Sequence, residues 1–357
     1  MDVLEPLGTA LLHDRVLQVL VGSVLLFLLV ALVFAAVTVV LRLRHERKER
    51  LWRRLEEWWE GPLLEAMADP ERVPELQDRI EEGYRLHFLE YVLQYARRVG
   101  GTERETLKAL ARPFLPLILP ELESEEVGIR ARAVQTVGLL GLPLYTAEVR
   151  SAMDDPSPLV AVIAAQHLAH EAGAVVAPDV LQTLDRFSAF SVGYLMDMVV
   201  ALGPDAIPPV RLALEQRDRP LRTRIVAARS LAALRDLAAA DLAAELTAKE
   251  EDPELLAALL QLLNGVGTEE HLPAVRNHLD SEHFFVRMRA TRALAELGTK
   301  DDLPLLIERL SDPSPWVAMA AARGAYRLGG EKPLSLLARR DDPVTPLARQ
   351  ILAEEGG

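Results

Sequence analysis

A long apolar stretch without charge lies near the start of the chain. Residues 16–41 read VLQVLVGSVLLFLLVALVFAAVTVVL, which is 26 residues without a charged side chain. As a helix they would extend about 39 Å, enough to cross a hydrocarbon core of about 30 Å with some tilt. A buried helix of a soluble protein rarely runs so far without a polar face. The pattern therefore predicts one transmembrane helix over residues 16–41.

The charges on either side of this stretch predict its orientation. Residues 1–15 carry acidic side chains and a single basic one, Arg15, whereas a basic cluster follows the stretch: Arg42, Arg44, Arg47, Lys48, Arg50, Arg53 and Arg54. A cleaved signal peptide, the competing interpretation, would have a shorter apolar region preceded by its basic residues. By the positive-inside rule we expect residues 1–15 outside and everything beyond Arg42 in the cytoplasm. The expected location is the cytoplasmic (inner) membrane of a bacterium.

A charged, tryptophan-rich segment follows over residues 42–62. Its charges alternate in sign at helical spacing, which predicts a helix that leaves the membrane and breaks at Gly61-Pro62. One interpretation places its aromatic and basic side chains at the lipid headgroups. The candidates for this membrane interface are Arg42, Arg44, Trp52, Trp58 and Trp59. In a straight helix, however, Trp58 lies about 25 Å beyond Leu41, so the alternative is that the tryptophans pack on the first repeat or on a partner.

Farther along the chain the apolar positions recur in similar units. DPSPWVAMAAARGAYRLGG, residues 312–330, closely echoes DPSPLVAVIAAQHLAHEAG, residues 155–173. Other copies are EEVGIRARAVQTVGLLG, RDRPLRTRIVAARSLAALRD, EEDPELLAALLQLLNGVG, DSEHFFVRMRATRALAELG and the degenerate FSAFSVGYLMDMVVALG. The markers that end these units are separated by 32, 30, 32, 32, 31 and 31 residues; they are Gly141, Gly173, Gly203, Arg235, Gly267, Gly298 and Gly329. A period this constant indicates stacked units rather than two globular domains.

Each unit contains the signals of a helical hairpin. An Asp can accept backbone hydrogen bonds at the helix start, Pro suits the first turn, and Gly permits a left-handed end. A second short helix follows, as in DLPLLIERL and HLPAVRNHL. Helices of about ten residues cannot bury an apolar stripe alone, so we expect about seven to eight hairpins to stack into an α-solenoid. We assign residues 63–357 to this solenoid, with a divergent unit ending near Gly100 and a truncated one at the C-terminal end.

These units resemble HEAT repeats, most clearly in DPSPWVAMAAARGAYRLG and DSEHFFVRMRATRALAELG. The short period is similar to that of the subtype also found in phycobilin lyases, and the resemblance covers roughly residues 85–357. It implies a binding surface more often than an enzyme. It also implies that the helix containing VRMRATRAL lines the concave face.

Composition supports an all-α fold and narrows the function. Aromatic residues make up only 5% of the chain, and Ala, Leu and Arg, which favour helices, are abundant. The formal net charge of −13 argues against a general nucleic-acid binder. With no cysteine, the chain has no disulfide, thiol nucleophile or cysteine-bound zinc. It also has no Walker loop, HExxH, GxSxG or Rossmann glycines, and we expect no cofactor.

Two enzyme families with related repeats are the alternatives. A site of the deoxyhypusine hydroxylase type needs several His-Glu pairs, but the repeats contain only His170-Glu171, and His45-Glu46 lies in the juxtamembrane segment. A metal site requires several converging ligands. A phycobilin lyase would hold a tetrapyrrole in a polar concave pocket, which no residue pattern here identifies.

Arginines recur on the helices expected to line the concave face. They are Arg130, Arg132, Arg222, Arg224, Arg287, Arg289, Arg292 and Arg323. We interpret the first of each pair as a cross-repeat ion pair with aspartates such as Asp218, Asp280 and Asp312. The second of each pair, Arg132, Arg224 and Arg289, is the better candidate for gripping an acidic segment or phosphates of a partner. Phe284 and Trp316, in matching turn regions, are candidate apolar anchors, although packing between units would explain them equally well.

The sequence thus predicts a single-pass membrane protein whose cytoplasmic HEAT-like solenoid serves as a scaffold or adaptor. The span would hold a bound protein partner at the membrane, and the repeats would select it. Candidate partners are an integral membrane enzyme or a component of envelope or polysaccharide synthesis. The rival hypothesis is an enzyme of the phycobilin lyase or deoxyhypusine hydroxylase type, and a bound metal or chromophore would distinguish the two.

Overall fold

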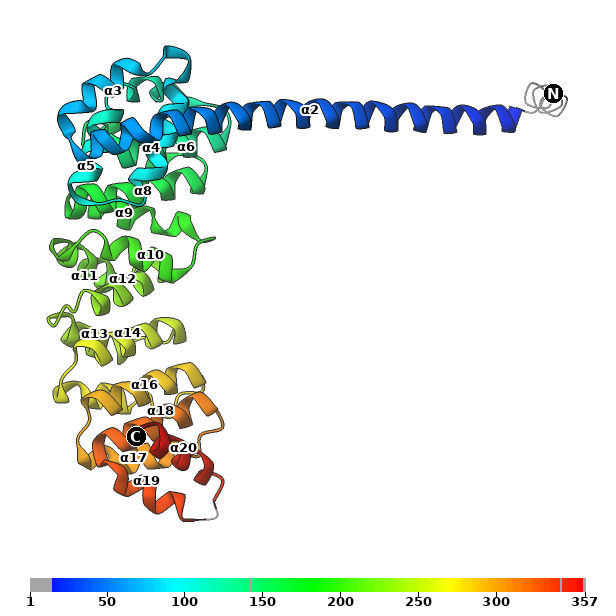
Figure 1. The fold of residues 1–357 in the computed structure, drawn as a ribbon. Coiled ribbons are helices and arrows are strands. Elements are labelled where there is room, and N and C mark those ends of the chain that lie inside the picture. Colours follow the sequence, from blue (N-terminus) through cyan, green and yellow to red (C-terminus); the bar gives the residue numbers. More distant parts are fainter. Residues whose placement is uncertain (1–14, 142, 341, 356–357) are drawn as a thin grey trace. The chain divides into compact units, whose positions relative to one another are not determined.

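The computed structural model describes residues 15–141, 143–340 and 342–355, without the side chains of residues 15–17, 41 and 43–49. Every regular element in these ranges is an α-helix or a short 3-10 helix, so the all-α prediction is confirmed (Figure 1). The chain divides into two compact units, residues 1–110 and residues 111–357. Of the predicted N-terminal segment, residues 1–15, residues 1–14 lie outside the described part, and Arg15 begins α2.

The first unit is built on one 54-residue helix, α2 (Arg15–Ala68). Its apolar part, Gln18–Val40, has a mean hydropathy of 3.0, and none of it is buried. The remaining elements of this unit are η1 (Pro70–Arg72), α3 (Val73–Arg79), η2 (Glu82–Tyr84), α4 (Arg85–Ala96) and α5 (Gly101–Ala111).

The structure continues α2 through Gly61-Pro62, so the predicted helix break is wrong. Proline within a helix removes one backbone hydrogen bond and is normally costly. Here Trp59, Leu63 and Ala66, on either side of Pro62, are all at most 1% exposed. Because burial of this face stabilises the helix on both sides of the proline, tertiary packing outweighs the local signal.

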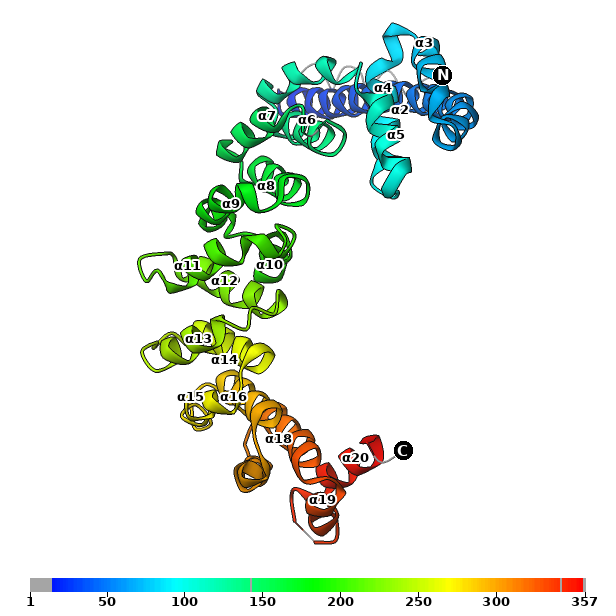
Figure 2. The same cartoon turned by 90° about the vertical axis from the view of Figure 1, so that its left-hand side faces the viewer.

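The second unit is a stack of helical hairpins with two rows of helices. The inner row comprises α6 (Val127–Leu140), α8 (Pro158–Ala172), α10 (Val192–Val200), α12 (Leu221–Ala233), α14 (Pro253–Val266), α16 (Phe284–Leu297), α18 (Pro315–Gly329) and α20 (Thr345–Glu355). The outer row comprises α7 (Thr146–Ser151), α9 (Ala177–Thr183), α11 (Ile207–Glu215), α13 (Ala239–Thr247), α15 (Leu272–Arg276), α17 (Leu303–Arg309) and α19 (Glu331–Ala338). Within this unit the inner row follows the inner side of the curve (Figure 2), as expected for α16. The α-solenoid prediction is confirmed.

Short 3-10 helices join or extend these elements. They are η3 (Leu115–Leu117), η4 (Leu119–Glu123), η5 (Ala152–Asp154), η6 (Gly173–Val176), η7 (Leu184–Phe187), η8 (Pro204–Ala206), η9 (Glu269–His271) and η10 (Lys300–Asp302). The predicted left-handed glycine at the end of a unit occurs at Gly173 (φ 60°) but not at Gly298 (φ −71°). At Gly298 a Cβ would lie 2.4 Å from the Leu294 carbonyl oxygen, so glycine is required there by space.

Small residues bring neighbouring inner-row helices close together. A Cβ on Gly138 of α6 would lie 2.6 Å from the His167 ring of α8, and one on Gly324 of α18 would lie 2.6 Å from Cβ of Ala295 on α16. Side chains between the helices are fully buried, for example Leu259 and Ala321. The core is therefore a continuous layer between inner-row neighbours, and no single hairpin could form it alone.

Bidentate ion pairs join one hairpin to the next at the DPSP motifs. Nε and Nη2 of Arg130 donate to the Asp155 carboxylate at 2.8 and 3.1 Å, and Arg287 donates to Asp312 in the same way at 2.8 and 2.9 Å. Each aspartate also accepts a 2.8 Å bond from the backbone N–H two residues later. The arginine hydrogen bonds are the main reason why the pKa values of Asp155 and Asp312 are lowered. These are the cross-repeat ion pairs that the sequence predicts for the first arginines.

The aspartates of the motif act differently from the predicted caps. Ser157 and Ser314 occupy the N-cap positions of α8 and α18 without a side-chain capping hydrogen bond. The aspartates instead accept hydrogen bonds within the turn before each helix. In EEDPELL, by contrast, Asp252 is a true N-cap that accepts bonds from the backbone N–H groups of Glu254 and Leu255. The outer row contributes its own ion pairs, Arg211 with Asp236 at 2.6 Å and Arg276 with Asp302 at 2.7 Å.

We expect Asp312→Ala to destabilise the solenoid by about 3–5 kcal/mol, because the largely buried Arg287 would lose the carboxylate that accepts two of its hydrogen bonds. The carboxylate of Asp312 is 2% exposed, whereas that of Asp280, which pairs with Arg309, is 80% exposed. The matched variant Asp280→Ala should therefore cost no more than about 1 kcal/mol. Urea unfolding of the full chain in detergent measures both, and equal losses would contradict a structural role for the Arg287–Asp312 pair.

Candidate docking surface

The arginines of the inner row fall into two groups according to their position in the helix. Arg130, Arg224 and Arg287 are each the fourth residue of their helices, α6, α12 and α16. Arg224 is only 7% exposed, and its Nη1 lies 3.1 Å from Oε2 of Glu250. It is therefore equivalent to Arg130 and Arg287 and forms a cross-repeat ion pair. The prediction of Arg224 as a docking residue is wrong. In α6 and α16 the first arginine is the fourth residue of the helix, whereas in α12 the first arginine is the second residue and Arg224 is the fourth.

The other predicted arginines lie where a partner could reach them. Arg132 on α6 is exposed, and Arg289 on α16 is half-buried; each is the sixth residue of its helix. Arg222, expected to pair with an aspartate between the helices, instead donates to the backbone carbonyl of Phe190. Arg132 and Arg289 thus remain candidates for docking, and Arg222 contributes to the structure.

A further row of polar side chains occupies the ninth position of successive inner-row helices. Arg229 of α12, Gln261 of α14, Arg292 of α16 and Arg323 of α18 follow one another at intervals of 32, 31 and 31 residues. We call these four residues the position-nine row. The arginines predicted from the sequence to line the concave face include Arg292 and Arg323 of this row but not Arg229. The constant interval is the signal that would have found it.

Arg289 and two members of the position-nine row, Arg229 and Arg292, are near enough for their positive charges to act on one another. The pKa of Arg289 is lowered, first by burial and then by the charges of Arg292 and Arg229. Within the described part of the chain, no ion pair engages any of these three arginines, and Nε of Arg229 is buried without a hydrogen-bond partner. We call Arg229, Arg289 and Arg292 the arginine cluster.

A groove lined by both apolar and charged side chains lies beside the arginine cluster, between α14, α16 and α18. It has a volume of about 260 Å³, and its lining includes Trp316, Met319, Ala295 and Arg292. Trp316 is 64% exposed. Arg327 and Glu296 pair across the same groove with Nη2 2.6 Å from Oε1. The groove thus offers an apolar surface bordered by arginine.

Phe284 does not share this groove. It is 47% exposed at the start of α16, and its ring packs edge-on against Phe285 at a centroid distance of 5.8 Å. Of the two predicted apolar anchors, only Trp316 lies among the residues that line the groove.

The tryptophans of α2 differ in their surroundings. Trp59 is 1% exposed and lies edge-on to Phe88 with ring centroids 5.1 Å apart, and Trp52 lies 4.4 Å from the His87 ring. For these two residues the structure favours packing on the first repeats over contact with lipid. Trp58 is 53% exposed. Of the basic candidates, Arg42 is exposed, and the side chain of Arg44 lies outside the described part.

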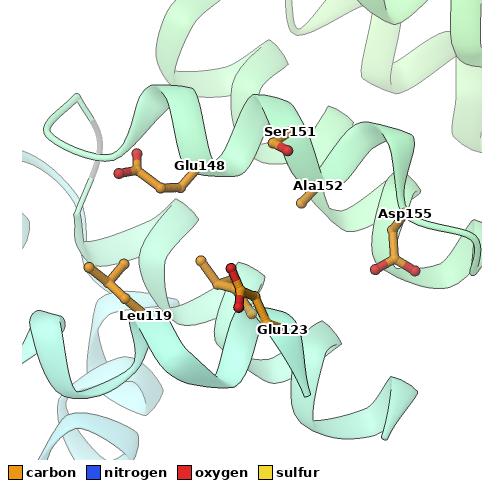
Figure 3. Close-up of a pocket in the computed structure, with 7 residues that line it drawn as sticks. Leu119, Glu123, Glu148, Ser151, Ala152 and Asp155 are labelled. Atoms are coloured by element: carbon orange, nitrogen blue, oxygen red, sulfur yellow. The ribbon is translucent and has the colours of Figure 1, made fainter. Parts of the chain in front are cut away.

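A second cavity, of about 370 Å³, lies at η4, α7 and η5 and is acidic. Glu148 and Asp155 lie on one side of it and Leu119 and Glu123 on the other (Figure 3). The Asp155 carboxylate already accepts hydrogen bonds from Arg130. Among the described residues no group of His, Asp and Glu side chains is arranged to hold a metal ion. His170 is exposed in the last turn of α8, where a basic group favours the helix end.

The geometry defines an α-solenoid whose inner row of helices follows its concave side (Figure 2). Residues 242–323 and 290–355 match the family described as HEAT repeats. The C-terminal part of the chain, residues 242–355, therefore consists of HEAT repeats, and the earlier hairpins repeat the same two-row arrangement. A comparison with curated protein sequences gives no match.

Several solved structures show distant similarity. The CpcE–CpcF complex of phycocyanin lyase from Nostoc sp. PCC7120 is 18% identical, covers 68% of this chain and 88% of that chain, and gives a TM-score of 0.33. Human deoxyhypusine hydroxylase in complex with glycerol is 15% identical, covers 68% and 96%, and gives 0.30. The karyopherin Kap121p mutant is 13% identical, covers 76% and 35%, and gives 0.41. Similarities this weak assign no activity to the chain.

We expect Trp59→Ala to destabilise the first unit by about 3–5 kcal/mol, because it leaves a large cavity against α4. Trp59→Phe should cost less, since the buried indole N–H has no hydrogen-bond partner among the described residues. Trp58→Ala serves as the matched control and should change stability little, because its side chain is 53% exposed. Urea unfolding followed by tryptophan fluorescence measures these changes. A larger effect of Trp58→Ala than of Trp59→Ala would contradict the assignment.

Proposed function

We propose that the protein is a single-pass membrane adaptor whose HEAT repeats recruit or regulate a protein partner at the cytoplasmic face of the membrane. The observation that carries this proposal is the exposed apolar segment Gln18–Val40. Soluble monomers rarely expose apolar patches larger than a few hundred Å². A bilayer would cover this segment fully.

The continuity of α2 supports the anchoring role. The same helix contains the apolar segment and Trp59, which is buried against α4. Trp59 lies about 28 Å beyond Val40 along the helix axis, so its packing site would stand clear of the hydrocarbon. A second apolar stretch, Pro158–Phe187, is 44% buried and belongs to the packed hairpins. The anchor is therefore assigned to α2 alone among the described helices.

Anchoring would act through effective concentration. A partner bound by the repeats is held near the membrane, which favours its encounter with membrane-bound components without any new contact. HEAT repeats commonly mediate protein interactions, and the inner row presents the arginine cluster and the groove beside it for this purpose. We propose an integral membrane enzyme or a component of envelope or polysaccharide synthesis as the partner. For the hydroxylase alternative, no group of His, Asp and Glu side chains in the described part of the chain supplies a metal-ligand set.

The orientation can be tested by cysteine labelling, because the chain contains no cysteine of its own. With Thr9→Cys, we expect an impermeant maleimide to label intact cells, since the positive-inside rule places residues 1–15 outside. With Asp301→Cys, we expect labelling only after permeabilisation. Labelling of Asp301→Cys in intact cells would reverse the proposed topology, and recovery of the full chain in the soluble fraction would remove the anchor.

Recruitment can be tested by copurification from native membranes. We expect a specific protein to copurify with the wild-type chain and to be lost with the double variant Arg289→Glu and Arg292→Glu. The control Arg217→Glu, a single charge reversal at an exposed position in the turn after α11, should retain it. Mass spectrometry of the eluates measures the difference. If the double variant retains every partner, the inner row is not the recruiting surface.

A further inference from the structure

The arginine cluster differs from the arginines at position four of the inner-row helices, which are held in ion pairs. The arginines at position four each have an Asp or Glu partner in the next hairpin. The chain contains 53 acidic residues against 40 basic ones, so acidic partners are not scarce. Within the described part of the chain, none of them forms an ion pair with Arg229, Arg289 or Arg292. The cluster is thus positive charge that the fold itself leaves uncompensated.

This arrangement is costly in the free protein. The charges of Arg229 and Arg292 disfavour the charged form of half-buried Arg289, in addition to the effect of its own burial. The buried Nε of Arg229 lacks an acceptor, and a buried donor without a partner is unfavourable. A carboxylate from outside would supply the missing negative charge at the exposed Arg292, and guanidinium groups bind carboxylates in bidentate geometry.

The adjoining groove adds an apolar requirement. Trp316, Met319 and Ala320 of α18 face it, and the indole of Trp316 is 64% exposed. Aromatic side chains beside arginine are the usual energetic centres of protein interfaces. A ligand that satisfied only the arginines would leave this apolar surface exposed.

We propose that α12, α14, α16 and α18 together bind an extended acidic protein segment whose carboxylates meet the arginine cluster and whose apolar side chain enters the groove at Trp316. Neighbouring helices lie about 10 Å apart, which corresponds to about three residues of extended chain. The segment would therefore carry two or more Asp or Glu residues, followed about three residues later by Leu or Phe. This inference rests on the adaptor function and specifies the chemistry of its partner.

A polyanion such as nucleic acid fits the surface less well. The cluster is local, and the whole chain has a net charge of −13, which repels a long polyphosphate. An apolar groove next to the cluster has no counterpart in a phosphate backbone. A protein segment provides both carboxylates and an apolar side chain.

The test is direct binding of a synthetic peptide to the full chain in nanodiscs of neutral phosphatidylcholine. The probe is a fluorescein-labelled peptide containing Glu-Asp-Glu and, three residues later, Leu; fluorescence anisotropy measures its affinity. We expect saturable binding that weakens strongly between about 50 mM and about 500 mM salt. Arg289→Glu with Arg292→Glu should weaken binding by about tenfold or more, and Arg217→Glu should stay within about twofold.

Further variants keep the test valid if the charge reversal disturbs folding. The double variant Arg289→Gln with Arg292→Gln removes the positive charges without introducing negative charges that repel the peptide, and it should also weaken peptide binding. Trp316→Ala should weaken binding of the Leu-containing peptide more than binding of a peptide with Ala in place of that Leu. This difference would identify the groove as the site that binds the apolar side chain. Circular dichroism confirms that each variant is folded.

Three results would overturn the inference. The first is that the peptide does not bind to the wild-type chain. The second is that a folded Gln or Glu double variant binds the peptide as tightly as the wild-type chain does. The third is that the wild-type chain binds single-stranded DNA or phosphatidylserine vesicles in place of the peptide. These outcomes are distinguishable from failure of the adaptor function. The topology and copurification experiments can succeed with a partner bound elsewhere, and the peptide assay does not depend on the orientation in the membrane.

Discussion

The structure of the repeat region depends on close contact between successive inner-row helices. Each hairpin is too short to bury its apolar stripe alone, so the next hairpin must complete its core. Glycine at positions such as 138 and 324 permits the close approach. The arginine–aspartate pairs then fix the register, because a bidentate pair tolerates little displacement. Together these contacts determine which residues of every inner-row helix face its neighbours and which remain accessible.

This register explains why arginines of the same helix have different roles. In α16, Arg287 points toward the next hairpin and is held by Asp312, whereas Arg289 and Arg292 lie on the accessible side. The arginine at the fourth position of the helix thus stabilises the stack, and the residue at the ninth position lies on its accessible surface. Because the hairpins repeat, a side chain at position nine is brought into line with its equivalents on neighbouring helices. A binding surface therefore arises from residues about 31 positions apart that no single hairpin contains.

The first unit connects an exposed apolar helix to a packed one without an intervening linker. The burial of Trp59, Leu63 and Ala66 carries α2 through Pro62. A continuous helix transmits position and orientation more rigidly than a Gly- or Ser-rich linker would. In a membrane adaptor this would restrict where the first helical unit stands relative to the bilayer.

The sequence by itself determined the all-α class, the repeat period, the apolar segment near the N-terminus and the ion pairs of Arg130 and Arg287. These follow from local patterns: apolar periodicity, turn residues and repeated motifs. Only the tertiary structure decided that Arg224 is buried against Glu250, that α2 passes through Pro62, and that Arg229 joins Arg289 and Arg292. Each of these depends on contacts between distant residues and on where a helix begins within its repeat. A shift of two residues in helix start moved Arg224 from the surface to the interior, and a single sequence carries too weak a signal to place that boundary.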